Sequence, residues 1–168
     1  MSRRGKIITI TAAVLLLAAV VVLVVRSPII SRTYVANCYY VEKKSFDRIA
    51  ELSRGYYEDG ESSIKINSEN GGEEILSLMS YLESKYQDDS DFPVFTAVDV
   101  YYDNEGDMAL DIQVRKIKIA NADGIDTPDV LCYDLVYADE DYSGSLADKL
   151  GRPFFGRWFV WSYDSYSG

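Results

Sequence analysis

The hydrophobic and polar positions separate one long apolar run near the amino terminus from a region of shorter, patterned segments. The run covers residues 7–25 (IITITAAVLLLAAVVVLVV), 19 positions in which Thr9 and Thr11 are the polar interruptions. At about 1.5 Å of rise per residue, a helix of this length nearly crosses the ~30 Å hydrocarbon core of a bilayer. The run exceeds the roughly 7–15 apolar residues of a cleavable export signal, and no suitable small-residue cleavage motif follows it. The pattern therefore predicts a retained transmembrane signal anchor.

The basic residues that flank this run predict its orientation. Three precede it and two follow it: Arg3, Arg4 and Lys6 against Arg26 and Arg32. Because cytoplasmic flanks carry the excess of lysine and arginine, residues 1–6 are expected in the cytoplasm. Residues 26–33 then form a juxtamembrane linker, and residues 34–168 form an extracytoplasmic domain. The membrane bilayer, bound through residues 7–25, is the first expected partner.

Two segments after the linker have the spacing of amphipathic helices. In the first, Ser45 is a candidate N-cap, and apolar residues from Phe46 to Tyr56 recur at helical intervals. In the second, Asn70 and Glu73 resemble a capping pair. One face of this second helix carries Ile75, Leu78, Met79, Leu82 and Tyr86. Before both helices, residues 33–41 (TYVANCYYV) are rich in tyrosine and valine and are predicted to be extended.

The remaining segments have the pattern of strands joined by turns. Alternation predicts strands at 94–102, 108–119, 130–138 and 157–163, with a short one at 64–66. Gly106 supplies the positive φ that the turn at 103–107 needs. Within 108–119 the apolar residues change parity after Val114, which predicts a β-bulge near Arg115–Lys116. Helices followed by consecutive strands indicate an α+β fold, with an antiparallel sheet of about four strands covered by two helices on one face.

The charge balance and the absence of histidine exclude several classes of function. The chain has 17 basic and 27 acidic residues, a net charge of −10, and no histidine. All 27 acidic residues but only 12 basic ones lie in residues 33–168, so this region carries −15. Such a field disfavours nucleic acid as a partner. Without histidine, the chain lacks Ser-His-Asp and Cys-His catalysis, histidine-based zinc sites and the usual proton shuttle near neutral pH.

The two cysteines and one acidic turn carry weak signals for other chemistry. Cys38 and Cys132 can form a disulfide outside the cell or stay reduced as small core residues, and the sequence leaves both alternatives open. The segment DEDYSGS, which begins at Asp139, has calcium-like spacing, but Leu150 stands where a bidentate glutamate is needed. The sequence predicts no metal, no cofactor and no catalytic residue.

Two acidic residues, Asp99 and Asp134, each interrupt an apolar strand. A partly buried acid would have a raised pKa, whereas an outward-facing acid on the solvated side of the sheet would not. The sequence favours the outward-facing position for both.

Aromatic residues are the remaining candidates for a binding surface. Trp158, Trp161 and Tyr163 share the last predicted strand, and the odd spacing of the two tryptophans places them on opposite faces, one of them in the core. The sequence favours a non-enzymatic interaction or accessory subunit of a membrane or envelope complex, with an envelope protein as partner. One alternative is a binding module for a cell-wall glycan or a small ligand that uses exposed aromatics. A more remote alternative is a carboxylate-based hydrolase.

Overall fold

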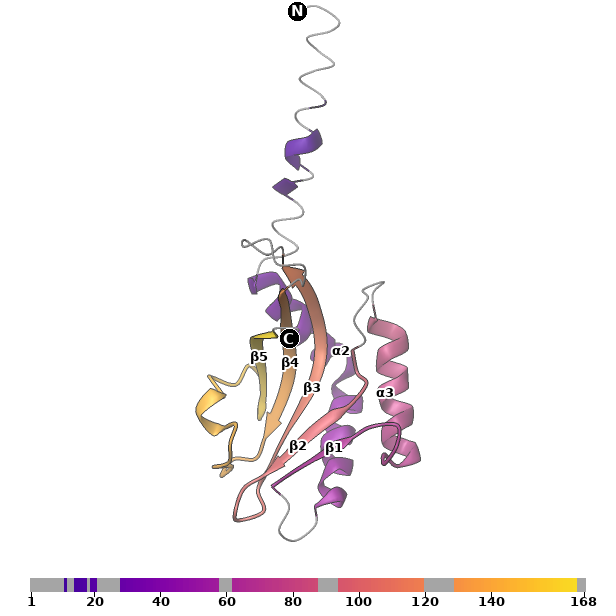
Figure 1. Ribbon diagram of the computed structural model, residues 1–168, viewed down its shortest axis with the longest axis vertical. Coiled ribbons are helices and arrows are strands. Elements are labelled where there is room, and N and C mark those ends of the chain that lie inside the picture. The colour runs from indigo at the N-terminus through magenta and orange to yellow at the C-terminus, as the bar shows by residue number, and fades with distance from the viewer. Residues whose placement is uncertain are drawn as a thin grey trace, which may run out of the picture. The chain divides into compact units, whose positions relative to one another are not determined.

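The computed structural model describes residues 11, 14–17, 19–20, 28–57, 62–87, 94–119 and 129–165 (Figure 1). Contacts between Cα atoms divide the chain into two compact units, Met1–Tyr34 and Val35–Gly168. The fold that positions the functional site belongs to the second unit.

The first unit contains the predicted membrane anchor. Of residues 7–25, the structure describes residues 11, 14–17 and 19–20, which are helical and have exposed side chains. Within the described residues, no helix combines the length and the apolar character needed to cross a bilayer. The predicted cytoplasmic segment 1–6 and most of the predicted span lie outside the described residues.

Helix α2, Pro28–Ser53, occupies the segment 33–41 that was predicted to be extended, so that prediction was wrong. Its buried side chains recur every three or four residues: Val35, Cys38, Tyr39, Glu42, Phe46, Ile49, Ala50 and Ser53. Burying this single face outweighs the strand preference of tyrosine and valine, because such preferences are weak against tertiary packing. The backbone leaves helical geometry at Glu42 (φ −109°, ψ 22°), shortly before the predicted start at Ser45. A short 3-10 helix, η1 (Arg54–Tyr56), follows.

Helix α3, Glu73–Tyr86, confirms the second predicted helix. Two glutamates in its first turn and Lys85 in its last turn match the helix dipole. The predicted cap was wrong, because the N-cap residue is Gly72, without a side-chain capping bond. The Asn70 side chain instead donates to the carbonyl oxygen of Lys65 at 2.8 Å, and so closes the turn that leads into the helix.

Glu42 joins α2 to α3 at the kink. Its buried carboxylate accepts hydrogen bonds from the hydroxyls of Tyr81 (3.3 Å) and Tyr86 (3.2 Å) and from Nζ of Lys85. Burial alone would raise the pKa of Glu42, but the hydrogen bonds from Lys85 and the two tyrosines outweigh burial and lower it. This polar contact fixes α3 beside α2.

Five antiparallel strands form one sheet in the order β1-β2-β3-β4-β5. Their bounds are Ser63–Ile66, Val98–Tyr102, Met108–Ile119, Asp129–Ala138 and Trp158–Ser165. The protein is therefore α+β, as predicted, with one strand more than the expected four, because the short segment 63–66 pairs with β2 as an edge strand. A 3-10 turn, η2 (Ala147–Lys149), lies between β4 and β5.

The sheet differs from the prediction in one strand boundary and agrees with it in one irregularity. β2 begins at Val98 and not at residue 94, because Phe95 adopts a left-handed conformation (φ 57°) with its ring buried. The predicted bulge is present slightly earlier, with a register shift between Gln113 and Arg115. Gly106 has the predicted positive φ, 86°.

Helix α2 passes behind the sheet in Figure 1 and covers one of its faces. The Trp158 indole Nε1 donates to Asp47 of α2 at 3.1 Å, and the Tyr102 hydroxyl donates to the carbonyl oxygen of Ser53 at 3.1 Å. The largest strand side chains on this face are fully buried, among them Leu110, Ile112 and Leu135. This layer between helix and sheet is the main hydrophobic core.

The described residues cover the opposite face, which we call the open face, only in part. Ala109, Val136 and Ala138 pack there against Tyr142 and Leu146 from the segment between β4 and β5. This second, smaller apolar cluster occupies the end of the sheet near the β4 carboxyl terminus. The rest of the open face is polar, and it carries the candidate site.

Candidate functional site

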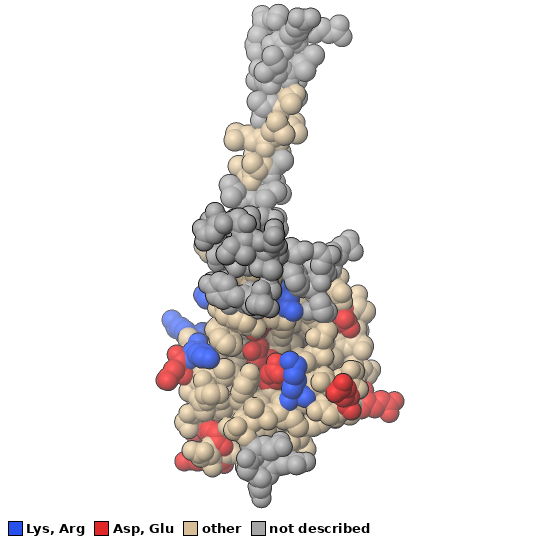
Figure 2. Space-filling model, viewed as in Figure 1, with Lys and Arg blue, Asp and Glu red and all other residues tan. Residues whose placement is uncertain are grey.

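Three aspartates on consecutive strands lie together on the open face. Asp99 of β2 is directly opposite Asp111 of β3, and Asp134 of β4 is opposite Gln113, two residues along β3 from Asp111. Cross-strand partners share a face, and so do residues two apart on one strand, so the three carboxyl groups converge. In Figure 2, acidic side chains lie beside a basic one near the middle of the face in view.

A cavity of about 150 Å³, which we call the acidic cavity, lies at this cluster. All five strands contribute to its lining, which consists of Lys65, Thr96, Ala97, Asp99, Asp111, Gln113, Asp134 and Tyr163. Side chains held on paired strands are positioned more rigidly than side chains on loops. The sheet therefore supplies a fixed frame for the polar groups.

Asp111 and Asp134 are buried, with 8% and 1% of their surface exposed. In each of them, the oxygen Oδ1 has no hydrogen-bond partner among the described residues. A buried polar atom left in this state costs about 1–3 kcal/mol of folding free energy. Native proteins retain few such atoms, and each one calls for an explanation such as a bound water, ion or ligand. The aspartates that carry these two buried oxygens are lining residues of the acidic cavity.

Burial favours the protonated forms of the two aspartates. Burial, followed by the negative charges of Asp134 and Asp99, raises the pKa of Asp111. Burial also raises the pKa of Asp134, although hydrogen bonds from Asp111 and Tyr163 oppose that rise. The rise is larger for Asp111 than for Asp134, so Asp111 is the acid of the pair that keeps a proton near neutral pH. Strongly perturbed acids in a cavity are characteristic of functional sites.

Tyr163 connects this pair to the rest of the cavity. Its hydroxyl accepts a hydrogen bond from Nε2 of Gln113 at 3.2 Å and lies close enough to Asp134 for the two groups to interact electrostatically. Burial, together with the charge of Asp134, raises the pKa of Tyr163 well above its usual range. The tyrosine therefore stays a neutral hydrogen-bond donor throughout the physiological pH range.

Comparison with known proteins gives no second example of this cavity. The chain matches no protein-family model, no curated protein and no solved structure. The arrangement of the cavity is therefore the basis for the functional conclusion.

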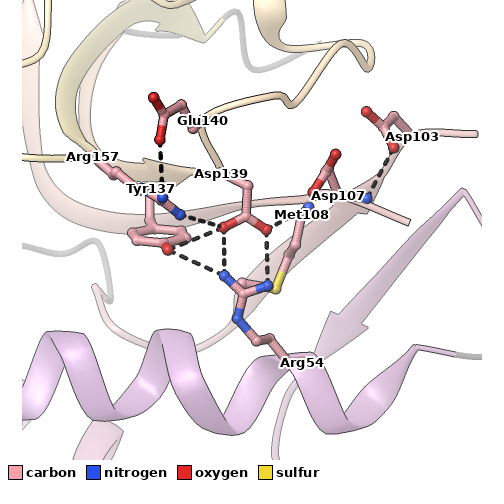
Figure 3. Close-up of polar contacts among 8 residues, drawn as sticks. All are labelled: Arg54, Asp103, Asp107, Met108, Tyr137, Asp139, Glu140 and Arg157. Atoms are coloured by element: carbon pink, nitrogen blue, oxygen red, sulfur yellow. Dashed lines mark hydrogen bonds and ion pairs between the residues drawn. The ribbon is translucent and has the colours of Figure 1, made fainter. Parts of the chain in front are cut away.

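A second charged cluster, centred on Asp139, has a structural role (Figure 3). The Asp139 carboxylate accepts hydrogen bonds from both terminal nitrogens of Arg54, and the bond from Nη1 is 2.8 Å long. It also accepts one from Nη1 of Arg157 at 3.3 Å. The Tyr137 hydroxyl (3.1 Å) and the Met108 amide (3.0 Å) complete the set. Burial alone would raise the pKa of Asp139, but the hydrogen bonds from Arg54 and Met108 lower it. With its oxygens saturated, Asp139 has no capacity for the calcium ion that its surrounding sequence resembles.

The three aromatic residues predicted as a binding surface lie in different parts of the structure. Trp158 is 2% exposed and packs in the main core, so its assignment to a binding surface was wrong. Trp161 lies on the open face, half-buried against the smaller apolar cluster, with its ring centroid 4.9 Å from that of Tyr163. Tyr163 lines the acidic cavity. The opposite orientation of the two tryptophans is confirmed, because odd spacing on a strand alternates faces.

The outward-facing position predicted for Asp99 and Asp134 holds for only one of them. The Asp99 side chain is 40% exposed and pairs with Lys65, whereas Asp134 is buried. The sequence reasoning missed Asp111 altogether. The signal was present in MALDIQV, where Asp111 interrupts the apolar strand 108–119 as Asp134 interrupts 130–138. Pairing these strands in register would have placed the acids side by side.

The two cysteines are separate buried thiols and do not form the disulfide that the sequence allowed. Cys132 shares the open-face parity of Asp134 on β4, whereas Cys38 lies on α2, behind the other face. The sheet therefore lies between the two sulfur atoms. The alternative of two reduced cysteines describes the structure.

Proposed function

We propose that the protein is a membrane-anchored, extracytoplasmic binding module that holds a small polar ligand in the acidic cavity. The observation that carries this proposal is that two lining residues of the cavity, Asp111 and Asp134, each have a buried carboxylate oxygen without a hydrogen-bond partner among the described residues. A ligand that donates hydrogen bonds to these oxygens offsets the free-energy cost of burying them without a partner. Residues 7–25 provide the anchor, with residues 1–6 in the cytoplasm, as the apolar run and its basic flank support.

Binding fits the acidic cavity better than hydrolysis does. Two neighbouring acids at a cavity are also the catalytic apparatus of glycosidases. An acid pair that shares a proton also occurs in aspartic proteases. Substrate pockets, however, usually enclose about 300–1,000 Å³, well above the volume of about 150 Å³ found here. The cavity accommodates a small ligand or one headgroup.

A ligand screen with a cavity-filling variant tests the binding module. We expect at least one small ligand from a panel of amines, sugars and polyols to raise the melting temperature of the full-length protein in detergent micelles. A ligand at 100 times its Kd adds about 2.7 kcal/mol to the free energy of unfolding. In Ala97→Leu the larger side chain fills the cavity, and the shift should disappear.

Ser80→Leu, on the exposed surface of α3, is the matched control and should keep the full shift. An equal shift in Ala97→Leu would place the ligand outside the cavity. A panel that shifts no melting temperature, at ligand concentrations up to tens of millimolar, would contradict the proposed binding function.

A second candidate function is supported by an exposed apolar patch. Tyr40, Val41 and Phe155 are 54%, 59% and 41% exposed, and the ring centroids of Tyr40 and Phe155 are 5.6 Å apart. Lys43 lies over the Phe155 ring at 5.7 Å. Tyrosine and phenylalanine are enriched in the cores of protein interfaces. This patch supports a role as an interaction or accessory subunit that binds an envelope protein.

Affinity purification from solubilised membranes tests the anchor and the partner together. We expect the full-length protein in the membrane fraction, and a stoichiometric partner retained when an unrelated anchor replaces residues 7–25. The double variant Tyr40→Ser, Phe155→Ser should lose that partner, because the change removes both rings of the patch. Loss of the partner with the foreign anchor would assign the interaction to residues 7–25, and recovery of the native chain in the soluble fraction would contradict the anchor.

A further inference from the structure

The acidic cavity holds more hydrogen-bond acceptors than donors. Asp111 and Asp134 each have a buried oxygen without a partner among the described residues, and Asp99 adds a third carboxylate. Among the described residues of the lining, Lys65 is the one basic side chain. Its Nζ is 3.6 Å from Oδ1 of Asp99, and its side chain is 61% exposed. A ligand of this cavity must therefore bring donors, and the surplus of acids favours one that also brings a positive charge.

The number and spacing of the ligating groups favour an organic cation over a metal ion. No set of three or more cysteine or carboxylate ligands in the described part of the chain is arranged to hold a metal. The volume of about 150 Å³ equals that of roughly five waters at ~30 Å³ each, enough for an ammonium group and a short alkyl chain. An ammonium group carries three N–H donors and no acceptor, which complements the two open oxygens. The ring of Tyr163 in the lining is a further favourable neighbour for a cation.

We propose that the acidic cavity binds the ammonium group of a small primary amine, and that binding expels a proton from the pair formed by Asp111 and Asp134. This inference rests on the proposed binding function and specifies its ligand. The exchange is balanced in charge, since one ammonium ion enters and one proton leaves to solvent, and no covalent bond to the ligand forms. Loss of the proton turns Asp111 from a donor into a second acceptor for the amine.

Near neutral pH, the proton that this site exchanges belongs to the aspartate pair, because the titratable tyrosine and cysteine neighbours keep theirs. The neighbours with a side-chain charge or proton are Lys65 of β1, Asp99 and Tyr101 of β2, Lys116 of β3, Cys132 of β4 and Tyr163 of β5. Burial raises the pKa of Tyr101 to about 12, and it also raises the pKa values of Cys132 and Tyr163. These three groups therefore keep their protons where the carboxyl pair loses its own.

Calorimetric titration of the full-length protein in detergent micelles with propylammonium chloride tests this inference. We expect saturable binding whose Kd falls by up to about tenfold per pH unit, over the range in which the pair still holds its proton. Titrations in two buffers of different ionisation enthalpy should show about one proton released for each ligand bound. The neutral isostere 1-propanol should bind at least tenfold more weakly.

Two variants separate the proton of the aspartate pair from the general charge of the cavity. Asp111→Asn keeps the donor to Asp134 but has no proton to release, so its Kd should be nearly independent of pH and no proton should appear. Asp99→Asn removes a charge from the lining and should weaken binding while proton release persists.

The possible results distinguish failure of the amine-for-proton exchange from failure of the proposed binding function. Equal binding of 1-propanol, or amine binding without proton release, would overturn the inference and leave the binding module standing. Failure of every ligand of the panel to shift the melting temperature of the wild-type protein would overturn both. Amine binding with proton release in the wild type and in Asp99→Asn, but not in Asp111→Asn, would establish the inference.

Discussion

At pH 8, Asp111→Asn is expected to raise the free energy of unfolding by about 1–3 kcal/mol, an unusual direction for a change in a buried residue. Because the pKa of Asp111 is raised in the folded protein, the folded state holds a proton that the unfolded chain has lost. The free energy of unfolding therefore falls as pH rises from the unfolded pKa, about 3.9, through the folded value, and levels off above it. Asparagine imitates the protonated acid, donates to Asp134 in the same way, and never ionises.

Urea denaturation of the full-length protein in detergent micelles, followed by tryptophan fluorescence, measures this effect. At about pH 3, where the acid is largely protonated in both states, Asp111→Asn and the wild type should differ little. The matched control is Asp99→Asn, which changes a 40%-exposed acid of the same cluster and should alter stability by less than about 0.5 kcal/mol at either pH. A destabilised Asp111→Asn at pH 8 would show that the aspartate pair does not hold a proton there.

Arg54→Met is expected to lower the free energy of unfolding by about 2–4 kcal/mol at pH 7. The Asp139 side chain is 6% exposed, and Arg54 supplies two of the hydrogen bonds that hold its charge in the protein interior. Arg157 remains in the variant, but its Nη1 is 3.3 Å from Oδ1 of Asp139. Most of the stabilisation of the buried Asp139 charge is therefore lost. A buried charge without a close partner is among the most destabilising changes that a single substitution makes.

The dependence on pH distinguishes this mechanism from a general loss of packing. The pKa of Asp139 is lowered in the folded protein, so its contribution is present above the unfolded pKa, about 3.9, and is lost as pH falls through the folded value. The difference between Arg54→Met and the wild type should therefore shrink below about pH 4. Arg48→Met breaks the exposed pair with Glu74 (2.7 Å) and should cost less than about 1 kcal/mol. Equal losses from the two variants would contradict a special role for Arg54.

Periodicity predicted the elements whose pattern has one dominant reading. In α3, three fully buried residues (Ile75, Met79 and Leu82) repeat at helical spacing, and the helix follows from them. In β3, the apolar residues change parity after Val114, and this change predicted the bulge. A strand with such a change can keep one face apolar only by inserting an extra residue there. The segment 33–41 failed this test. Its tyrosines and valines favour a strand by composition, yet Val35, Cys38 and Tyr39 also fit a helix face, and packing of that face decided the outcome.

The candidate site shows a different limit of the sequence. Tyr163 was identified as a candidate from its aromatic character, and Asp134 from its position inside an apolar strand. Neither signal indicated that Asp134 meets Asp111, because the meeting depends on which residues of β3 and β4 are opposite each other. A shift of register by one residue would turn Asp111 to the covered face of the sheet.

By itself, the sequence determined the class of fold, the apolar run that supports an anchor, and the absence of histidine chemistry, because these depend only on residue types and local periodicity. The tertiary structure alone decided that Trp158 is core, that the two cysteines remain apart, and that two aspartates share a buried cavity. Each of these results depends on contacts between distant residues. Strand register sets such contacts, and register follows from how the whole sheet buries its apolar face. The acidic cavity is thus a product of the assembled sheet, although each of its carboxylates was visible in the chain.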